Sequence, residues 1–150
     1  MPQSLANMVV HAVFGTKYRR PLLRESVWAG LRAHTARVLY ESGCTPLRVG
    51  GVEDHVHLLF RMSRTVTLAH TLQTVKASSS RWLKTQGPSL RDFHWQGGYG
   101  VFSVSPRHVN TVIRYIANQK EHHRARTFQQ EYLETLGRNG VAFDERYVWD

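Results

Sequence analysis

Apolar residues recur along the chain with two different periods, and these periods predict its strands and helices. Runs of apolar and β-branched residues predict strands at residues 7–14, 47–52, 55–62 and 99–104. Apolar residues at helical spacing, with start and stop signals at the ends, predict helices at about residues 24–42, 67–86, 106–124 and 127–136. The predicted order is therefore β-α-β-β-α-β-α, followed by a last short helix.

This order predicts an α+β fold of the ferredoxin-like type. In β-α-β-β-α-β, two crossover helices cover one face of a four-stranded antiparallel sheet, which leaves the other face for a third helix or a ligand. Glu53-Asp54 is the expected hairpin turn, and Gly50-Gly51 suggests a bend or a bulge. We expect one domain over residues 1–150, with a core at about 7–124 and a C-terminal helix and docked aromatic tail at about 125–150.

The helix predicted at residues 106–124 carries two faces of different character. Ser105-Pro106 has the form of an N-cap followed by proline at the first helical position. An apolar stripe at i, i+3, i+4 and i+7 is expected to bury against the sheet: Val109, Val112, Ile113 and Ile116. Four residues able to take part in chemistry share one flank of that stripe: His108, Tyr115, Gln119 and His122. Taken alone, this Tyr115 is typical of an amphipathic border residue.

His55-Val56-His57 is the strongest candidate for a metal site. Side chains alternate along a strand, so both imidazoles point to one face, roughly 6–7 Å apart, while Val56 points to the other with Leu58 and Phe60. That second side is expected to be the helix-covered core. A pair of exposed sheet histidines without a ligand is the alternative that this spacing leaves open.

The charge of the chain favours a polyanionic partner. Lys and Arg number 20 against 11 acidic residues, which gives a net charge of +9. Such an excess favours nucleic acid, because each neutralised phosphate releases counterions. The single cysteine, Cys44, permits neither an internal disulfide nor a cysteine-based zinc site. No apolar run approaches the roughly 20 residues that cross a bilayer, so we expect a cytoplasmic protein without a membrane partner.

Cations and aromatic residues alternate in several places, as in proteins that bind single-stranded nucleic acid. Such clusters lie after the first strand and on the second helix, and include Lys17, Tyr18, Arg19, Arg20, Lys76, Arg81 and Trp82. For any one of these residues, a solvated basic surface with aromatic rings packed inward is the simpler interpretation.

Four blocks, taken in order and spacing, resemble the small single-domain tyrosine transposases of the HUH superfamily, encoded by simple bacterial insertion sequences. The resemblance extends from about Met8 to His123. It is carried by Thr16–Pro21, Asp54–Leu59, Trp95–Ser105 and Tyr115–His123.

The resemblance implies an activity and the residues that perform it. It implies that His55, His57 and Gln119 hold a divalent metal, Mg²⁺ or Mn²⁺, and that Tyr115 on the added C-terminal helix is the nucleophile. The reaction would cleave and rejoin single-stranded DNA at insertion-sequence ends through a 5′-phosphotyrosine. Homodimers and hairpin DNA ends are the implied partners, and Lys17, Arg19, Arg20, Lys76 and Arg81 are our candidates for DNA contacts.

Two alternatives remain at this point. A relaxase or replication-initiator nickase would share the metal and tyrosine chemistry, although this short chain carries no additional domain. A non-catalytic ferredoxin-like module that binds nucleic acid, such as a domesticated relative, would keep the fold and the charge without using Tyr115.

Overall fold

The computed structural model describes residues 2–150, and its element order is the predicted one with three short 3₁₀ turns added and with the helix predicted at residues 106–124 divided. In chain order the elements are β1 (Val9–Gly15), η1 (Lys17–Arg19), α1 (Glu25–Glu41), β2 (Thr45–Gly51), β3 (His55–Arg61), α2 (Leu68–Lys84), η2 (Pro88–Leu90), β4 (Gly100–Val104), η3 (Pro106–His108), α3 (Val109–Ala117), α4 (Gln119–His122) and α5 (Phe128–Arg138). The four strands and both crossover helices agree with the predicted ranges to within two residues at each end.

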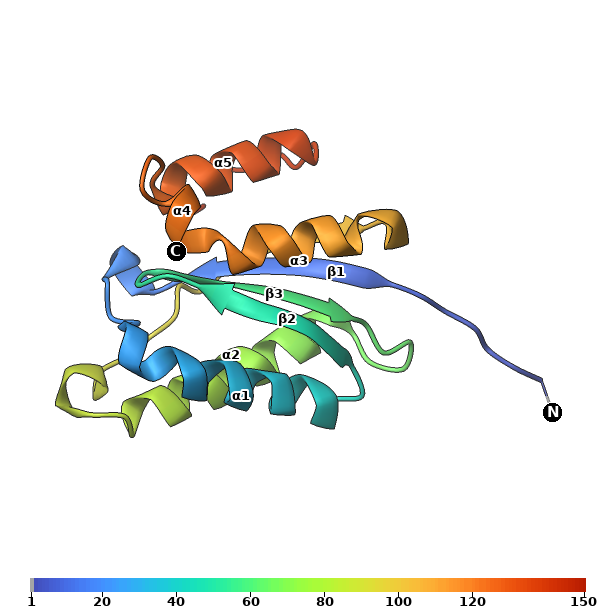
Figure 1. The fold of residues 1–150 in the computed structure, drawn as a ribbon, viewed down its shortest axis with the longest axis horizontal. Helices are drawn as coiled ribbons and strands as arrows, with labels where there is room; N and C mark the ends of the chain where they lie inside the picture. Colours follow the sequence, from blue (N-terminus) through green and yellow to red (C-terminus); the bar gives the residue numbers. More distant parts are fainter. Residues whose placement is uncertain (1) are drawn as a thin grey trace.

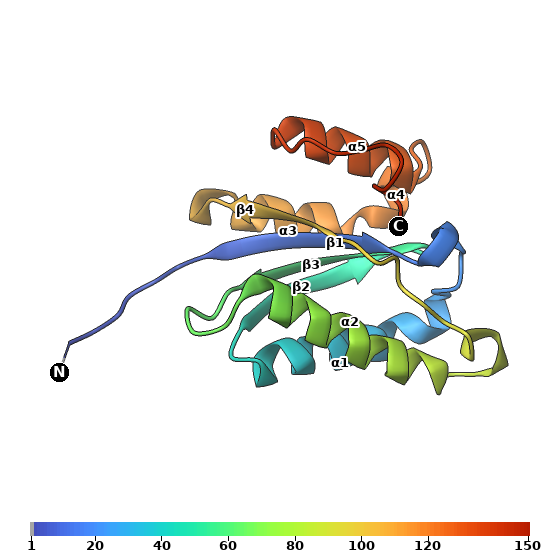
Figure 2. The same ribbon diagram turned by 180° about the vertical axis from the view of Figure 1, so that it is seen from behind.

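The four strands form one antiparallel sheet in the order β2-β3-β1-β4. The crossovers through α1 and α2 place β1 and β3 in the middle, where nearly all their side chains are buried, while β2 and β4 form the more exposed edges. Figure 2 shows β4 beside β1 at one edge. The α+β, ferredoxin-like prediction is confirmed, as is the hairpin turn at Glu53-Asp54.

Two layers of helices enclose the sheet. Helices α1 and α2 cover one face, and α3, α4 and α5 lie over the other (Figure 1). Val56, Leu58 and Phe60 of β3 belong to the core under α1 and α2, as predicted from strand alternation. On the opposite face Leu59 packs with Ile116 of α3, and the predicted apolar stripe of α3 surrounds this contact.

The segment predicted as one helix over residues 106–124 is three pieces. Ser105 makes no side-chain capping hydrogen bond, and Pro106 starts a 3₁₀ turn instead of the first turn of an α-helix. The chain then leaves helical geometry at Asn118, where φ is −100° and ψ is 24°. The prediction of a continuous helix was wrong because residue periodicity does not register a single non-helical residue between two helical segments. The break separates Gln119 from the helix that carries Tyr115.

Gly50 and Gly51 serve close packing, and the register shift of β2 lies elsewhere, between Pro46 and Arg48. A Cβ on Gly50 would lie 2.8 Å from a methyl carbon of Ile116 and 3.1 Å from its carbonyl oxygen. A Cβ on Gly51 would meet the His55 carbonyl oxygen and the Trp28 ring. The two glycines therefore let α3 and α1 approach the sheet closely.

Gly50→Ala is expected to destabilise the protein by about 1–3 kcal/mol, because the added methyl pushes α3 away from the sheet. Gly137→Ala is the matched control: it lies within α5, nothing stands within 4 Å of its added Cβ, and the change is expected to stabilise by about 0.5–1 kcal/mol. Urea unfolding of both variants measures the difference. Equal stabilities would contradict the close-approach explanation.

The C-terminal tail docks on the sheet face that carries α5. Val148 and Trp149 pack against a cluster that includes Phe128 and Tyr132, and the Gly98 amide donates to the Asp150 carbonyl oxygen at 2.8 Å. A capping box at Thr127 starts α5. Of the predicted tail, residues 141–147 are exposed, and the contacts are made by Val148, Trp149 and Asp150. Over residues 2–150, no helix combines the length and the apolar character that crossing a membrane requires.

Candidate functional site

His55 and His57 lie side by side on β3, on the sheet face covered by α3, α4 and α5. Their ring centroids are 5.1 Å apart, and the two residues are only 0% and 1% exposed. Strand alternation sends both imidazoles to this face, and the helices above exclude water from it. The histidine pair is therefore buried, contrary to the exposed pair that the spacing left open.

A buried glutamate from α5 completes the cluster. Glu131 is 1% exposed and lies on the inward face of α5 with Phe128, Tyr132 and Leu136. Its Oε1 atom lies 3.0 Å from His57 Nε2, 3.3 Å from His55 Nε2 and 3.3 Å from His123 Nε2. Three imidazole nitrogens thus converge on one carboxylate oxygen.

This donor set fits a divalent metal ion. One ligand atom each from His55, His57 and Glu131 lie within 4.8 Å of one another. The Gln119 Oε1 atom lies 3.0 Å from His55 Nε2 and 3.1 Å from His123 Nε2, so it faces the same point. Imidazole nitrogens with a carboxylate suit manganese or zinc better than magnesium, which prefers an all-oxygen shell.

The Nδ1 atom of each strand histidine, on the ring edge away from Glu131, contacts a second polar group. His55 Nδ1 lies 2.8 Å from Asp54 Oδ1, and His57 Nδ1 lies 2.8 Å from His11 Nε2. In metal proteins such partners fix the orientation and the tautomer of a ligating histidine. Asp54 and His11 therefore leave both Nε2 atoms directed at Glu131.

The electrostatics keep the carboxylate charged. Burial opposes ionisation of Glu131, but hydrogen bonds from His123, His55 and His57 outweigh it and hold the pKa of Glu131 far below its usual range. Burial also disfavours protonation of His55, yet hydrogen bonds to Asp54 and Glu131 raise the pKa of His55 to about 9. Burial lowers the pKa of His57 to about 4, so this imidazole is neutral, whereas His55 would have to release its additional proton to bind a metal.

Tyr115 of α3 is joined directly to the cluster. Its hydroxyl donates a hydrogen bond to Glu131 Oε2, the second oxygen of the same carboxylate. Its ring lies 4.5 Å from the His122 ring and 5.8 Å from the His57 ring. Burial and the bond to anionic Glu131 raise the pKa of Tyr115 well above its ordinary value. The phenol is therefore neutral and oriented toward the candidate metal ligands.

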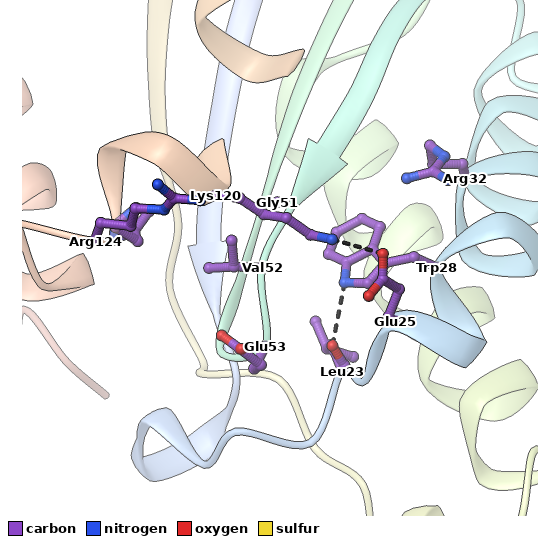
Figure 3. Close-up of a pocket in the computed structure, with 10 residues that line it drawn as sticks. Leu23, Glu25, Trp28, Arg32, Gly51, Val52, Glu53, Lys120 and Arg124 are labelled. Carbon is purple, nitrogen blue, oxygen red and sulfur yellow. Dashed lines mark hydrogen bonds and ion pairs between the residues drawn. The ribbon is translucent and has the colours of Figure 1, made fainter. Parts of the chain in front are cut away.

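Two cavities flank the cluster. One, of about 470 Å³, is bordered by His123 and by the cations Arg32, Lys120 and Arg124. In Figure 3, Lys120 reaches over Gly51 toward Glu25, to which its Nζ atom is paired at 2.6 Å. The other cavity, of about 310 Å³, is lined on the far side by His11, His108, Tyr115 and Arg138, among others. The first cavity is bordered mainly by charged residues, and the second has a mixed polar and apolar lining.

The predicted DNA-binding cations lie in different surroundings. Lys17, Arg19 and Arg20 lie in or next to η1, which follows Gly15, the backbone partner of His55. Arg81 is exposed on α2, on the opposite face of the sheet (Figure 1). Lys76 donates to the carbonyl oxygens of Gln96, Gly97 and Gly98 at 2.7, 3.1 and 2.9 Å, and burial lowers its pKa to about 8. Its ammonium therefore holds a turn.

Sequence reasoning brought His55, His57, Tyr115 and Gln119 together but missed Glu131, His123 and His11. Two of these left a signal. Glu131 interrupts the apolar stripe Phe128, Tyr132 and Leu136, where a lone acid needs a partner. His11 lies between Val9 and Val13 on the same face of β1, where a histidine among buried apolar residues is unusual. The position of His123 depends on the turn after Asn118, which periodicity did not reveal.

Known proteins share both the sequence pattern and the fold. A curated relative, the ISDra2 transposase TnpA of Deinococcus radiodurans, is 24% identical over 116 residues, covering 74% of this chain and 83% of the relative. A crystal structure of a candidate transposase from the same organism superposes with a TM-score of 0.62 at 23% identity, over 79% of this chain and 98% of that one.

A second solved structure, a REP-associated tyrosine transposase bound to a REP hairpin, gives a TM-score of 0.61 at 11% identity, over 82% of this chain and 72% of that one. The two structural likenesses establish the fold. The sequence model described as "Transposase IS200 like" matches residues 4–119, which is 116 of the 150 residues. With this match over most of its length, the chain belongs to the IS200-like family of Y1-type transposases, enzymes that cut and transfer DNA strands.

Proposed function

We propose that this transposase cleaves and rejoins single-stranded DNA at insertion-sequence ends through a 5′-phosphotyrosine on Tyr115. One observation carries the proposal: the Tyr115 hydroxyl and three imidazoles share the two oxygens of Glu131. Nucleophile and candidate metal ligands are thus connected by one buried side chain. A half-buried tyrosine usually has a hydrogen-bond partner, and here that partner is the carboxylate on which the imidazoles converge.

The chain's own residues account for positioning. His55, His57 and Glu131 would hold a divalent cation, with Gln119 and His123 in reach of it. Such a cation, Mn²⁺ or Mg²⁺, would polarise the scissile phosphate and stabilise the charge that develops on it. Asp54 and His11 orient the two strand histidines, and Glu131 keeps the phenol directed at the cluster.

In the cleavage step, the Tyr115 oxygen forms a bond to phosphorus and the bond from phosphorus to the 3′ oxygen breaks. One strand leaves with a 3′-hydroxyl, and the 5′ phosphate stays esterified to Tyr115. The phenol proton passes to water, and the departing 3′ oxygen takes up a proton. Attack by another 3′-hydroxyl reverses these changes, so rejoining requires no ATP.

The charge and the relatives support the choice of substrate. The net charge of +9 favours DNA, and one related structure was solved with a REP hairpin. We propose hairpin-forming ends as the partner, contacted by Lys17, Arg19 and Arg20. The engagement of Lys76 with backbone carbonyls and the distant face of Arg81 make these two weaker candidates.

Assembly follows from the resemblance and from one contact. We propose a homodimer. The hydrogen bond between Tyr115 and Glu131 within one chain supports action of the tyrosine in its own chain's site. Mixing a Tyr115→Phe chain with a His57→Ala chain decides this, because activity of the mixture requires a tyrosine that acts across the dimer.

The adduct assay tests the proposal. Wild-type protein is incubated with single-stranded oligonucleotides that carry hairpins near a cleavable junction, with Mn²⁺ or with EDTA, and denaturing gels detect covalent protein–DNA species. An adduct that requires the metal is expected. Absence of an adduct over a broad set of hairpin substrates would favour the non-catalytic module. Nicking without strand rejoining would favour the relaxase-type alternative.

His11→Ala is expected to weaken Mn²⁺ binding roughly 10–100-fold, as losses of partners behind metal-ligating histidines do. Without His11, the His57 Nδ1 atom loses the hydrogen-bond partner that fixes its tautomer. His11→Gln, whose amide oxygen accepts a hydrogen bond, should recover much of the affinity, and His34→Ala on α1 is the histidine control. Calorimetric Mn²⁺ titration of proteins with matched thermal stability measures the effect. Equal affinities for wild type and His11→Ala would contradict it.

A further inference from the structure

The turn η1 has a backbone that side chains rarely adopt. Tyr18 has φ of 58° and Arg19 has φ of 56°, so two consecutive residues with side chains are left-handed. Within residues 2–150 they are the only residues other than glycine with positive φ. Each costs about 1–2 kcal/mol relative to the right-handed form. Such strain persists only where the surroundings over-determine the backbone, and it concentrates at functional sites.

The neighbours of η1 hold this strained shape from several sides. The Thr16 amide donates to the Asp54 carbonyl oxygen at 2.9 Å, and the Lys17 amide donates to the His94 carbonyl oxygen at 2.8 Å. The Thr16 hydroxyl donates to the Arg20 carbonyl oxygen at 2.8 Å and closes the turn. The Arg19 guanidinium lies 5.4 Å from the Trp149 ring of the docked tail.

The effect of this shape is to present one aromatic ring to solvent. Tyr18 is 74% exposed, and none of the contacts between rings in the described part of the chain involves it. The Lys17 ammonium lies 5.3 Å from the ring centroid, and Arg20 is exposed beside it. The strained backbone therefore exposes the Tyr18 ring to solvent, an arrangement that does not stabilise the fold.

Tyr18 follows the end of β1 that pairs with His55 of the candidate site. Gly15 pairs with His55 across the sheet, and Tyr18 follows three residues later, which limits the distance between the Cα atoms of Gly15 and Tyr18 to about 11 Å. The Asp54 carbonyl that holds Thr16 belongs to the residue whose carboxylate orients His55. The ring and the metal cluster are thus attached to the same end of the β1–β3 pair.

We propose that Tyr18 is a stacking platform for an unpaired base of the strand bound at the His55–His57–Glu131 cluster. Lys17 and Arg20 would contact phosphates next to that base. Exposed aromatic rings with adjacent cations bind single strands in this way, with the ring taking the base and the cations following the backbone. This inference rests on the proposed function, because it assumes that the ligand is single-stranded DNA.

Binding in the absence of cleavage tests the platform. In a Tyr115→Phe background with EDTA, Tyr18→Ala is expected to weaken the affinity for a fluorescent single strand roughly 5- to 100-fold, whereas Tyr18→Trp retains it. Tyr40, also 74% exposed but on α1, is the matched control, and Tyr40→Ala should change nothing. The salt dependence adds a second readout: Tyr18→Ala leaves its slope unchanged, whereas Lys17→Ala lowers it by about 0.7.

A glycine variant separates the contribution of the Tyr18 ring to DNA affinity from the effect of the strained backbone. Tyr18→Gly relieves the strain at positive φ, so its thermal stability is expected to equal or exceed that of wild type while DNA affinity falls as in Tyr18→Ala. Wild-type affinity in Tyr18→Ala or in Tyr18→Gly overturns the inference. So does a change of molecular mass on sedimentation of Tyr18→Ala, which would assign the ring to contact between copies.

The adduct assay distinguishes failure of this inference from failure of the proposed function. A wild-type adduct combined with unchanged binding by Tyr18→Ala removes only the platform. Weakened binding without any wild-type adduct leaves Tyr18 as a base-binding residue of a protein that does not cleave.

Discussion

Tyr115→Phe is expected to abolish the covalent protein–DNA adduct while leaving the fold and the affinity for single-stranded DNA intact. The phenylalanine ring keeps the contacts with the His122 and His57 rings, so only the hydroxyl is lost. Glu131 Oε2 still accepts from Gln119 Nε2 at 3.3 Å, which limits the loss of stability to about 1 kcal/mol. Without the phenol oxygen no phosphotyrosine can form, and strand transfer falls by about a thousandfold or more.

Tyr132→Phe is the control for Tyr115→Phe. Tyr132 is buried on α5, and burial raises its pKa to about 12, but its ring packs with Phe128 and Trp149 instead of the histidines. This variant should form the adduct at the wild-type rate. Denaturing gels measure adduct formation by both variants, and peptide mapping identifies the residue that carries the nucleotide. An adduct that persists in Tyr115→Phe moves the nucleophile to another residue and contradicts the proposed mechanism.

Glu131→Gln is expected to weaken Mn²⁺ binding by more than the roughly 10–100-fold typical of residues that only orient ligands. The amide keeps the shape of the side chain but removes the charge on which three imidazoles converge. Loss of that charge also lowers the pKa of Tyr115 toward its ordinary value near 10, although burial keeps part of the increase. A pH titration of phenolate absorbance measures this pKa. Subtracting the titration of Glu131→Gln/Tyr115→Phe from that of Glu131→Gln leaves the contribution of Tyr115.

Glu134→Gln on the same helix is the matched control, because Glu134 is exposed and, among residues 2–150, pairs only with Arg126, at 2.5 Å. It should keep wild-type Mn²⁺ affinity and the wild-type titration of Tyr115. Calorimetry with proteins of equal thermal stability compares the two variants. If Glu131→Gln binds Mn²⁺ as tightly as Glu134→Gln does, Glu131 is no ligand and the metal site must use Gln119 as its oxygen donor.

Strand periodicity carried much of the correct prediction. Alternation along β3 placed His55 and His57 on one face and Val56, Leu58 and Phe60 on the other, and the structure has this arrangement. A period of two is a local property of the backbone, so it can be read without knowledge of the partners. The family was recognised from four blocks, and the IS200-like match confirms that recognition.

Helix periodicity was less informative near the site. It placed Tyr115 and Gln119 on one flank of a single helix, and both do reach the cluster. They reach it from separate helices on either side of Asn118. The assignment of Gln119 as a metal ligand stays a prediction, since Glu131 offers a charged oxygen at the same point.

By itself, the sequence determined the order of the elements, the ferredoxin-like fold, the family and the face on which the two histidines lie. These depend on local periods, turn signals and residue order along the chain. Only the tertiary structure placed the Glu131 carboxylate among three imidazoles, turned His11 toward His57 and exposed Tyr18 on a strained turn. Glu131 and His57 are 74 residues apart, and contacts across such a distance arise from the packing of α5 over the sheet, which no local pattern encodes.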